Sequence, residues 1–143
     1  MMNFFLSFSL INASINPSVS EYSDLNPSLS QEVGQSCGAT NIYYIYDVDI
    51  EPWPPTPGLY AQMNMTGIFL QNADVQEVIL GTCYNGMVWN YNSIQVGYPY
   101  NFGDEAIFLI GIVFPTQPGN YINNIQLSTN VHISCWQYSY TLS

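Results

Sequence analysis

The chain almost completely lacks basic side chains, since it contains no Lys or Arg and a single histidine, His132. Ten Asp and Glu residues give it a formal net charge of −10 at pH 7. Because phosphate groups are bound mainly by cationic side chains, this composition excludes nucleic acid as a partner. Salt bridges between side chains would all have to involve His132, so the fold must be held by apolar burial and hydrogen bonds.

Recognisable catalytic motifs are also missing. His132 has no serine, cysteine or acidic partner in a pattern typical of a nucleophilic triad. Three scattered cysteines and one histidine lack the spacing of a zinc site. We therefore predict that the protein is not an enzyme and that it carries no cofactor and no zinc centre.

No apolar run is long enough for a transmembrane helix. The longest, Ala106 to Pro115, has about half the residues that a span requires, so we expect no stable insertion into a membrane. A shorter apolar run, Phe4 to Ile11, is followed by Ala13, a pattern typical of a signal peptide, although the usual basic residues are missing. Residues 1–13 are accordingly predicted to be a signal peptide, with an apolar segment that stays in the product as the alternative. Secretion would place the protein outside the cell, or in the lumen of an acidic or secretory compartment.

The 143 residues fit one domain, and 48% of them are hydrophobic, which is enough for a core. Residues 14–36 are rich in Ser, Asn, Pro and Glu and are predicted to form an extended N-terminal arm or linker. Residues 37–143 alternate between short strand patterns and turns, and the Asn85-Gly86 pair is typical of a hairpin. The predicted strands cover residues 42–50, 59–70, 75–84, 87–91, 105–114, 121–129 and 131–142.

Seven or eight strands without a helix predict an all-β protein, an immunoglobulin-like β-sandwich of two antiparallel sheets. The segment 42–50 is a good example of the period-2 pattern of a half-buried strand. It places Asp47 and Asp49 on one face and apolar side chains on the other, namely Ile42, Tyr44, Tyr46, Val48 and Ile50.

From Cys37 to the C-terminus, about three quarters of the chain, the sequence resembles the ML family, the MD-2-related lipid-recognition domains that include Niemann-Pick type C2 sterol carriers. The similarity consists of short motifs in the same order. They are Ser36-Cys37-Gly38, the bend Pro52-Trp53-Pro54-Pro55-Thr56-Pro57-Gly58, the hairpin Tyr84-Asn85-Gly86, the segment Tyr98-Pro99 to Gly103, the bend Pro115-Thr116-Gln117-Pro118-Gly119-Asn120-Tyr121, and Cys135 in the closing strand.

This resemblance implies a sandwich whose sheets splay apart to hold a sterol, a fatty acid or a phospholipid tail. It also implies a disulfide between Cys37 and Cys135. The family's two inner disulfides have no counterparts here, because Tyr98 stands where one of those cysteines would be and Cys83 is unmatched.

The walls of such a lipid cavity would be the inward faces of the central strands. An ordinary packed core lined by the same residues is the alternative. The candidate cavity residues are Tyr44, Tyr46, Met63, Met65, Ile79, Trp89, Ile107, Leu109, Val113, Ile125, Leu127 and Ile133.

Two polar features have either a functional interpretation or an interpretation as ordinary solvated surface. Asp47, Asp49 and Glu51 recur every second residue, so their repulsion would raise their pKa values or attract Ca²⁺, unless the face is simply solvated. Asn64 begins an Asn-Met-Thr sequon and is a candidate N-glycosylation site.

Two functions therefore remain at the level of sequence. The first is a secreted lipid-binding domain that holds its ligand between two sheets. The second is a structural subunit of an extracellular filament, coat or matrix, which would self-assemble when the arm of residues 14–36 adds a strand to a neighbour.

Overall fold

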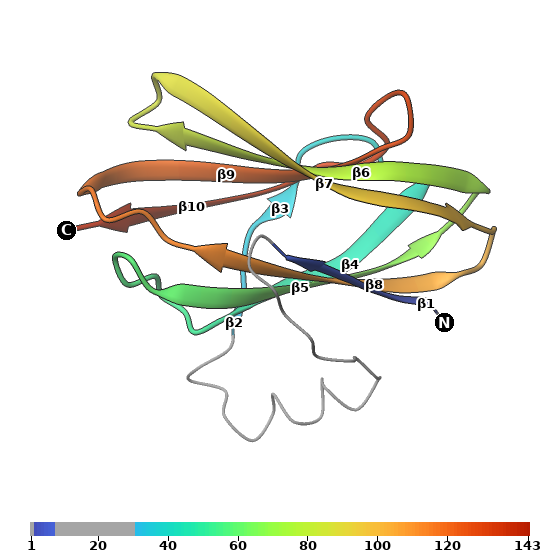
Figure 1. The fold of residues 1–143 in the computed structure, drawn as a ribbon, viewed down its shortest axis with the longest axis horizontal. Coiled ribbons are helices and arrows are strands. Elements are labelled where there is room, and N and C mark those ends of the chain that lie inside the picture. Colours follow the sequence, from blue (N-terminus) through green and yellow to red (C-terminus); the bar gives the residue numbers. More distant parts are fainter. Residues whose placement is uncertain (1, 8–30) are drawn as a thin grey trace.

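The computed structural model describes residues 2–7 and 31–143, and its regular elements are strands that form two facing sheets (Figure 1). The first sheet has the order β1-β8-β5-β4-β2 and the second the order β3-β10-β9-β6-β7. The strands are β1 (Met2–Ser7), β2 (Gln31–Glu32), β3 (Gln35–Ser36), β4 (Tyr43–Glu51), β5 (Tyr60–Phe69), β6 (Ala73–Tyr84), β7 (Val88–Tyr100), β8 (Glu105–Val113), β9 (Gly119–Ser128) and β10 (Trp136–Leu142). In this part of the chain no helix could cross a membrane.

The predicted all-β sandwich is confirmed. The long strands pair antiparallel with their neighbours, whereas β1 runs parallel to β8. In β5 the alternation is regular, with Ala61, Met63 and Met65 fully buried between the sheets and the intervening residues facing outward. Each buried apolar side chain of this size contributes about 1.5–3 kcal/mol, so the inward rows of both sheets hold the sandwich together.

The prediction for β4 was wrong over its first half. A β-bulge between Ile45 and Asp47 adds one residue to the strand and reverses the alternation. Tyr43 and Ile45 are therefore buried before the bulge, and Tyr44 and Tyr46 are each 47% exposed. After the bulge the predicted pattern holds, with the apolar side chains inside.

Strand β7 is longer than predicted. It continues through Gly97 and Pro99 to Tyr100, where the sequence indicated a loop. A second bulge, opposite the step from Val75 to Glu77, falls in this stretch, and Gly97 has a positive φ of 59°. Pro99 is tolerated because β7 is an edge strand. At the other end of the chain, β10 begins at Trp136, whereas we predicted its strand from residue 131.

The Asn85-Gly86 hairpin is confirmed. Both residues have positive φ, 51° for Asn85 and 70° for Gly86, as a tight turn between twisted strands requires. The turn between β6 and β7 lies at the upper left of Figure 1, above the ends of β9 and β10.

The last part of the predicted arm belongs to the sandwich. Strand β2 pairs with β4 in the first sheet, and β3 pairs with β10 in the second. Between them Val33 is buried, and its carbonyl oxygen accepts a hydrogen bond of 2.8 Å from the Trp136 indole nitrogen. Residues 14–30 lie outside the described residues, so self-assembly through the arm stays a prediction. The signal peptide also stays a prediction: its residues 2–7 form β1 beside β8, and residues 8–13 lie outside the described residues too.

The disulfide implied by the family resemblance is confirmed. Cys37 and Cys135 are bonded, with their Cα atoms 4.9 Å apart and a separation of 98 positions in sequence. The bond joins the chain just after β3 to the residue before β10, and it therefore ties two distant parts of the sequence in the second sheet. Cys83 is free and buried.

Candidate functional site

A cleft of about 280 Å³ opens between the two sheets at one end of the sandwich. Its first wall is the C-terminal end of β8, and its second wall comes from β6, β7, β9 and β10 of the opposite sheet. We call this end of the molecule the open end.

The floor of the cleft is apolar. Its larger side chains are Leu80, Ile112, Phe114, Tyr138 and Tyr140. The Phe114 and Tyr140 rings meet edge to face with their centroids 5.3 Å apart, an arrangement that aromatic pairs favour. Burial raises the pKa of both Tyr138 and Tyr140 far above the ordinary value, so both phenols are neutral across the physiological range.

The rest of the lining is polar but uncharged, and includes Thr82, Asn92 and Asn123. The Asn123 side-chain nitrogen donates to Thr82 Oγ1 at 2.7 Å and to the Gly81 carbonyl oxygen at 3.2 Å. The Asn123 Oδ1 atom is buried and has no hydrogen-bond partner. The cleft thus combines an apolar floor with an unused hydrogen-bond acceptor.

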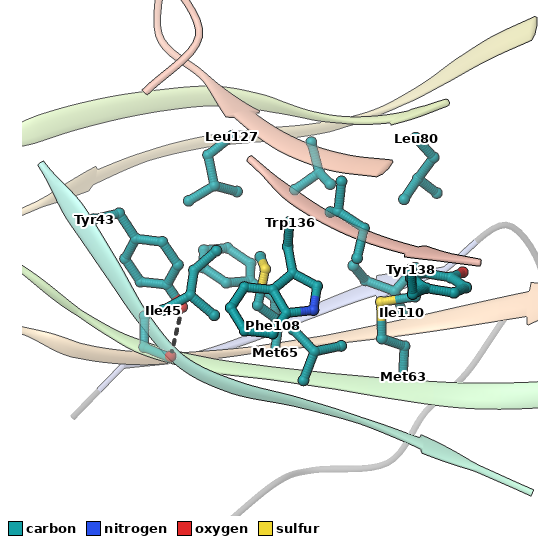
Figure 2. Close-up of a cluster of buried hydrophobic side chains, with 14 of the residues drawn as sticks. Tyr43, Ile45, Met63, Met65, Leu80, Phe108, Ile110, Leu127, Trp136 and Tyr138 are labelled. Carbon is teal, nitrogen blue, oxygen red and sulfur yellow. Dashed lines mark hydrogen bonds between the residues drawn. The ribbon is translucent and has the colours of Figure 1, made fainter. Parts of the chain in front are cut away.

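The middle of the sandwich, in contrast, is filled by side chains. Figure 2 shows Met63, Met65, Phe108 and Ile110 of the first sheet facing Leu127 of the second. All five are fully buried. The alternative of an ordinary packed core therefore describes the centre of the molecule, and the cleft lies to one side of this core, at the open end.

The opposite end is closed by four interlocking rings, and we call it the closed end. Tyr43 and Phe69 lie 4.7 Å apart, and Phe69 stacks on Tyr100 at 4.3 Å with an interplanar angle of 8°. Phe108 meets Tyr43 edge to face at 5.7 Å. The Tyr43 hydroxyl donates to the Ala106 carbonyl oxygen, the bond drawn in Figure 2.

The structure divides the twelve predicted cavity residues. Five lie in the core between the sheets, namely Met63, Met65, Ile125, Leu127 and Ile133. Of the other seven, Val113 borders the cleft. The inward orientation predicted for the remaining six is wrong, and these are Tyr44, Tyr46, Ile79, Trp89, Ile107 and Leu109.

Alternation along the strands explains these errors. Tyr44 and Tyr46 precede the bulge in β4, whereas Ile107 and Leu109 alternate with the core row of β8, which begins at Ala106. In β8 the alternation does not distinguish the inner from the outer face, because both faces of the strand are apolar. Val113 follows the same alternation but borders the cleft, with 63% of its surface exposed.

Ile79 and Trp89 also lie on the outer face, because the core row of the second sheet runs through Val78 and Leu80. The Trp89 and Tyr91 rings stack there at 5.9 Å. The cleft residues that the sequence analysis missed come from β6, β7, β9 and β10, and from the end of β8 and the bend that follows it. The sequence offered one indication of an aromatic wall, namely the alternation of Tyr138 and Tyr140 in the last strand.

The acidic residues of β4 share one outward face, as predicted. Desolvation by burial, followed by the charges of Asp47 and Glu32, raises the pKa of Asp49 to about 6. The Asp47 pKa is also raised, first by burial and then by Glu32. The sequence analysis predicted raised pKa values from repulsion alone, and the structure adds burial as the larger cause. No group of three acidic, His or Cys side chains that could hold a metal ion occurs in residues 31–143, and Ca²⁺ binding gains no support.

Asn64 lies half-buried on the outer face of β5, where its Oδ1 accepts a hydrogen bond of 3.2 Å from Gln62 Nε2. Its glycosylation stays a prediction.

Comparison with known proteins points to one fold. No family model matches the chain. A Dictyostelium discoideum protein named "putative phosphatidylglycerol/phosphatidylinositol transfer protein" is 24% identical over 127 residues, which cover 78% of this chain and 83% of that protein.

Two solved structures share the architecture. The C-terminal domain of wzt has a TM-score of 0.59 and 12% identity, over 83% of each chain. A Niemann-Pick type C2 protein from the Japanese carpenter ant has a TM-score of 0.57 and 13% identity, over 78% of this chain and 99% of that one. The two-sheet β-sandwich predicted from the sequence is therefore confirmed as the fold of this chain, and the Niemann-Pick type C2 protein has the same fold.

Proposed function

We propose that the protein binds a lipid, with the apolar tail of the lipid lying between the two sheets and entering through the cleft at the open end. The observation that carries this proposal is an apolar-floored opening between the sheets of an ML-type sandwich. The name of the Dictyostelium relative, a phospholipid transfer protein, agrees with it. The role is binding and carriage, not catalysis.

The cleft is small for a lipid. Its 280 Å³ lies just below the range of about 300–1,000 Å³ that is typical of small-molecule sites. A tail would therefore extend the cleft inward by displacing flexible core side chains, and methionine is the residue best suited to such repacking. Met63, paired with Ile110 across β5 and β8, is available for this. Tyr138 also borders a second opening of about 450 Å³ beside β2 and β3, which offers a way through for a longer tail.

Secretion is part of the proposal. The Cys37–Cys135 disulfide supports it, because such bonds persist in oxidising compartments and are rare in the cytosol. The apolar run near the N-terminus, residues 4–11, supports it as well. Expression with an epitope tag at the C-terminus, followed by N-terminal sequencing of the exported protein, tests both export and cleavage near residue 13.

The direct test is the mass spectrum of solvent extracts from the purified protein, which should contain a stoichiometric lipid. A matched pair of variants then locates the site. Asn92→Trp fills the mouth of the cleft, whereas Asn90→Trp adds the same ring two residues earlier on β7, at an exposed position outside the lining. We expect Asn92→Trp alone to lose bound lipid. Equal lipid content in both variants and the wild type would contradict entry through this cleft.

A further inference from the structure

One buried polar atom beside the cleft has the chemistry to select a ligand. We propose that Asn123 is the specificity-determining residue of the cleft, and that its Oδ1 atom accepts a hydrogen bond from the hydroxyl group of an uncharged lipid. This inference rests on the proposed function and adds to it the class of headgroup that the site prefers.

The orientation of the Asn123 amide is set by its surroundings. A side-chain amide has two N–H donors and one oxygen acceptor. The Nδ2 atom has an acceptor on each side, the Thr82 hydroxyl oxygen at 2.7 Å and the Gly81 carbonyl oxygen at 3.2 Å. Rotating the amide by half a turn would bring its oxygen against the Gly81 carbonyl and lose that bond. The oxygen therefore remains unpaired and buried, and a donor on a guest molecule would satisfy it.

The place of Asn123 fits the junction between a lipid tail and its headgroup. On β9 it lies in register with Thr82 of β6 and Tyr138 of β10, and both neighbours also line the cleft. The next residue of the same inward row is Ile125, which is fully buried in the core. A tail packed on the apolar floor would thus put its polar end beside the Asn123 oxygen.

Charge keeps an anionic group away from the Asn123 oxygen. The chain has no Lys or Arg, and no charged residue lines the cleft. A carboxylate or phosphate oxygen placed there would face the Asn123 oxygen with no cation to compensate it, and burying an unpaired charge is costly. A neutral hydroxyl group supplies the donor that the site lacks and brings no charge.

The neighbouring residue provides a matched control. Asn124 also has a buried Oδ1 without a partner, and it is one of the residues that border the same cleft. Its side chain points to the outer face, because it occupies the space above Gly81 beside the Tyr91 ring. The two residues therefore carry the same unpaired Oδ1 acceptor on opposite faces of the sheet, Asn123 on the inner face and Asn124 on the outer face.

The experiment compares ligands that share one tail. Hexadecanol carries the hydroxyl donor, hexadecyl methyl ether lacks it, and hexadecanoate at pH 7 carries a charge; binding is measured by displacement of a fluorescent lipid. For the wild type we expect hexadecanol to bind about tenfold more tightly than the ether, as a single hydrogen bond allows, and hexadecanoate to bind weakest. Asn123→Leu should bind the alcohol and the ether equally, and Asn124→Leu should keep the tenfold preference.

Thr82→Val provides a second variant in case Asn123→Leu does not fold. It removes the acceptor that orients the amide, and we expect the preference for hexadecanol over the ether to fall. If the wild type binds alcohol and ether equally, or if Asn124→Leu loses the preference, the role of Asn123 is overturned and lipid binding stands. If the wild type binds none of the three compounds, the proposed function fails and this inference fails with it.

Discussion

The two ends of the sandwich are both aromatic, but they are built differently. At the closed end four rings from both sheets interlock, and the Tyr43 hydroxyl is satisfied by a backbone carbonyl. At the open end the rings of Tyr138 and Tyr140 share the space between the sheets with Thr82 and Asn123. Apolar surface is sealed at one end, and polar groups face inward at the other.

This difference separates stability from binding. A buried acceptor without a partner lowers stability, so the Asn123 oxygen is a cost that the fold carries at the open end. Well-packed rings at the closed end can offset that cost, because each large apolar side chain contributes a few kcal/mol. Local departures from good packing are expected at sites that bind a ligand. Changes at the closed end should therefore lower stability most, and changes at the open end should lower lipid binding most.

The largest expected effect comes from the disulfide, which lies away from the cleft. Replacing Cys37 and Cys135 by Ala releases a loop of 98 residues, which should lower the free energy of unfolding by about 4–5 kcal/mol. Urea unfolding of the double variant measures this loss. Cys83→Ala removes a buried thiol outside the bond and serves as the control, with a smaller loss. If the double variant were as stable as the control, the Cys37–Cys135 disulfide would not stabilise the sandwich.

A pair of ring deletions compares the two ends directly. Phe69→Ala at the closed end should lower the free energy of unfolding by about 3–5 kcal/mol, because it leaves a cavity beside Tyr43 and Tyr100. Tyr140→Ala at the open end removes a half-buried ring and should cost only about 1–2 kcal/mol. Lipid content of the purified variants should show the reverse order. Equal losses of stability would mean that the two ends do not differ as described.

A smaller effect is expected from the one imperfection of the closed end. The Tyr100 hydroxyl is buried there without a hydrogen-bond partner, although its ring stacks well on Phe69. Tyr100→Phe removes that oxygen and keeps the ring, so it should raise the free energy of unfolding by about 1 kcal/mol. Tyr43→Phe is the matched control, and it should lower stability because the Tyr43 hydroxyl is bonded. Urea unfolding of both variants measures these changes. If Tyr100→Phe were less stable than Tyr43→Phe, the Tyr100 hydroxyl could not be the unpaired, destabilising group at this end.

Much of the fold could be predicted from local patterns. The alternation in residues 59–70, the Asn85-Gly86 turn and the prolines after residue 51 each act over a few residues, so they are visible in the sequence. The Cys37–Cys135 bond required the family resemblance, because three cysteines alone allow three pairings. The bulge in β4 was missed since it depends on the partner strand. Its one indication was Gly67, which pairs with Ile45 and leaves room for the Tyr43 ring.

The site was less predictable than the fold. Predicted cavity residues were selected for size and apolarity, and those that face inward fill the core. The cleft instead depends on polar residues such as Thr82 and Asn123, which look like surface positions in sequence. Only the register of β9 against β6 shows that Asn123 faces inward and Asn124 outward. A shift of one residue would exchange their roles, and local sequence does not determine that register.

The smallest expected effect lies outside both ends, at Asp49 on the outer face of β4. Its pKa is raised from 3.8 to about 6 by burial and by the charges of Asp47 and Glu32, so the folded state binds a proton more tightly than the unfolded chain. The stability linked to Asp49 is therefore fully present below about pH 4 and is lost as pH rises through 6. Because the group is half-exposed, solvent screening limits the change to about 0.5–1 kcal/mol.

Asp49→Asn should flatten this slope, and the variant should be more stable than the wild type at pH 7 and no more stable near pH 4. Urea midpoints measured from pH 4 to 7 test both statements, with Glu51→Gln at the exposed end of the same strand as the control that keeps the slope. Lipid binding should be the same in all three proteins at each pH, since Asp49 faces away from the space between the sheets. A variant that changed lipid affinity along with stability would show that the outer face of β4 communicates with the cleft, and the separation of the open end from the rest of the molecule would have to be abandoned.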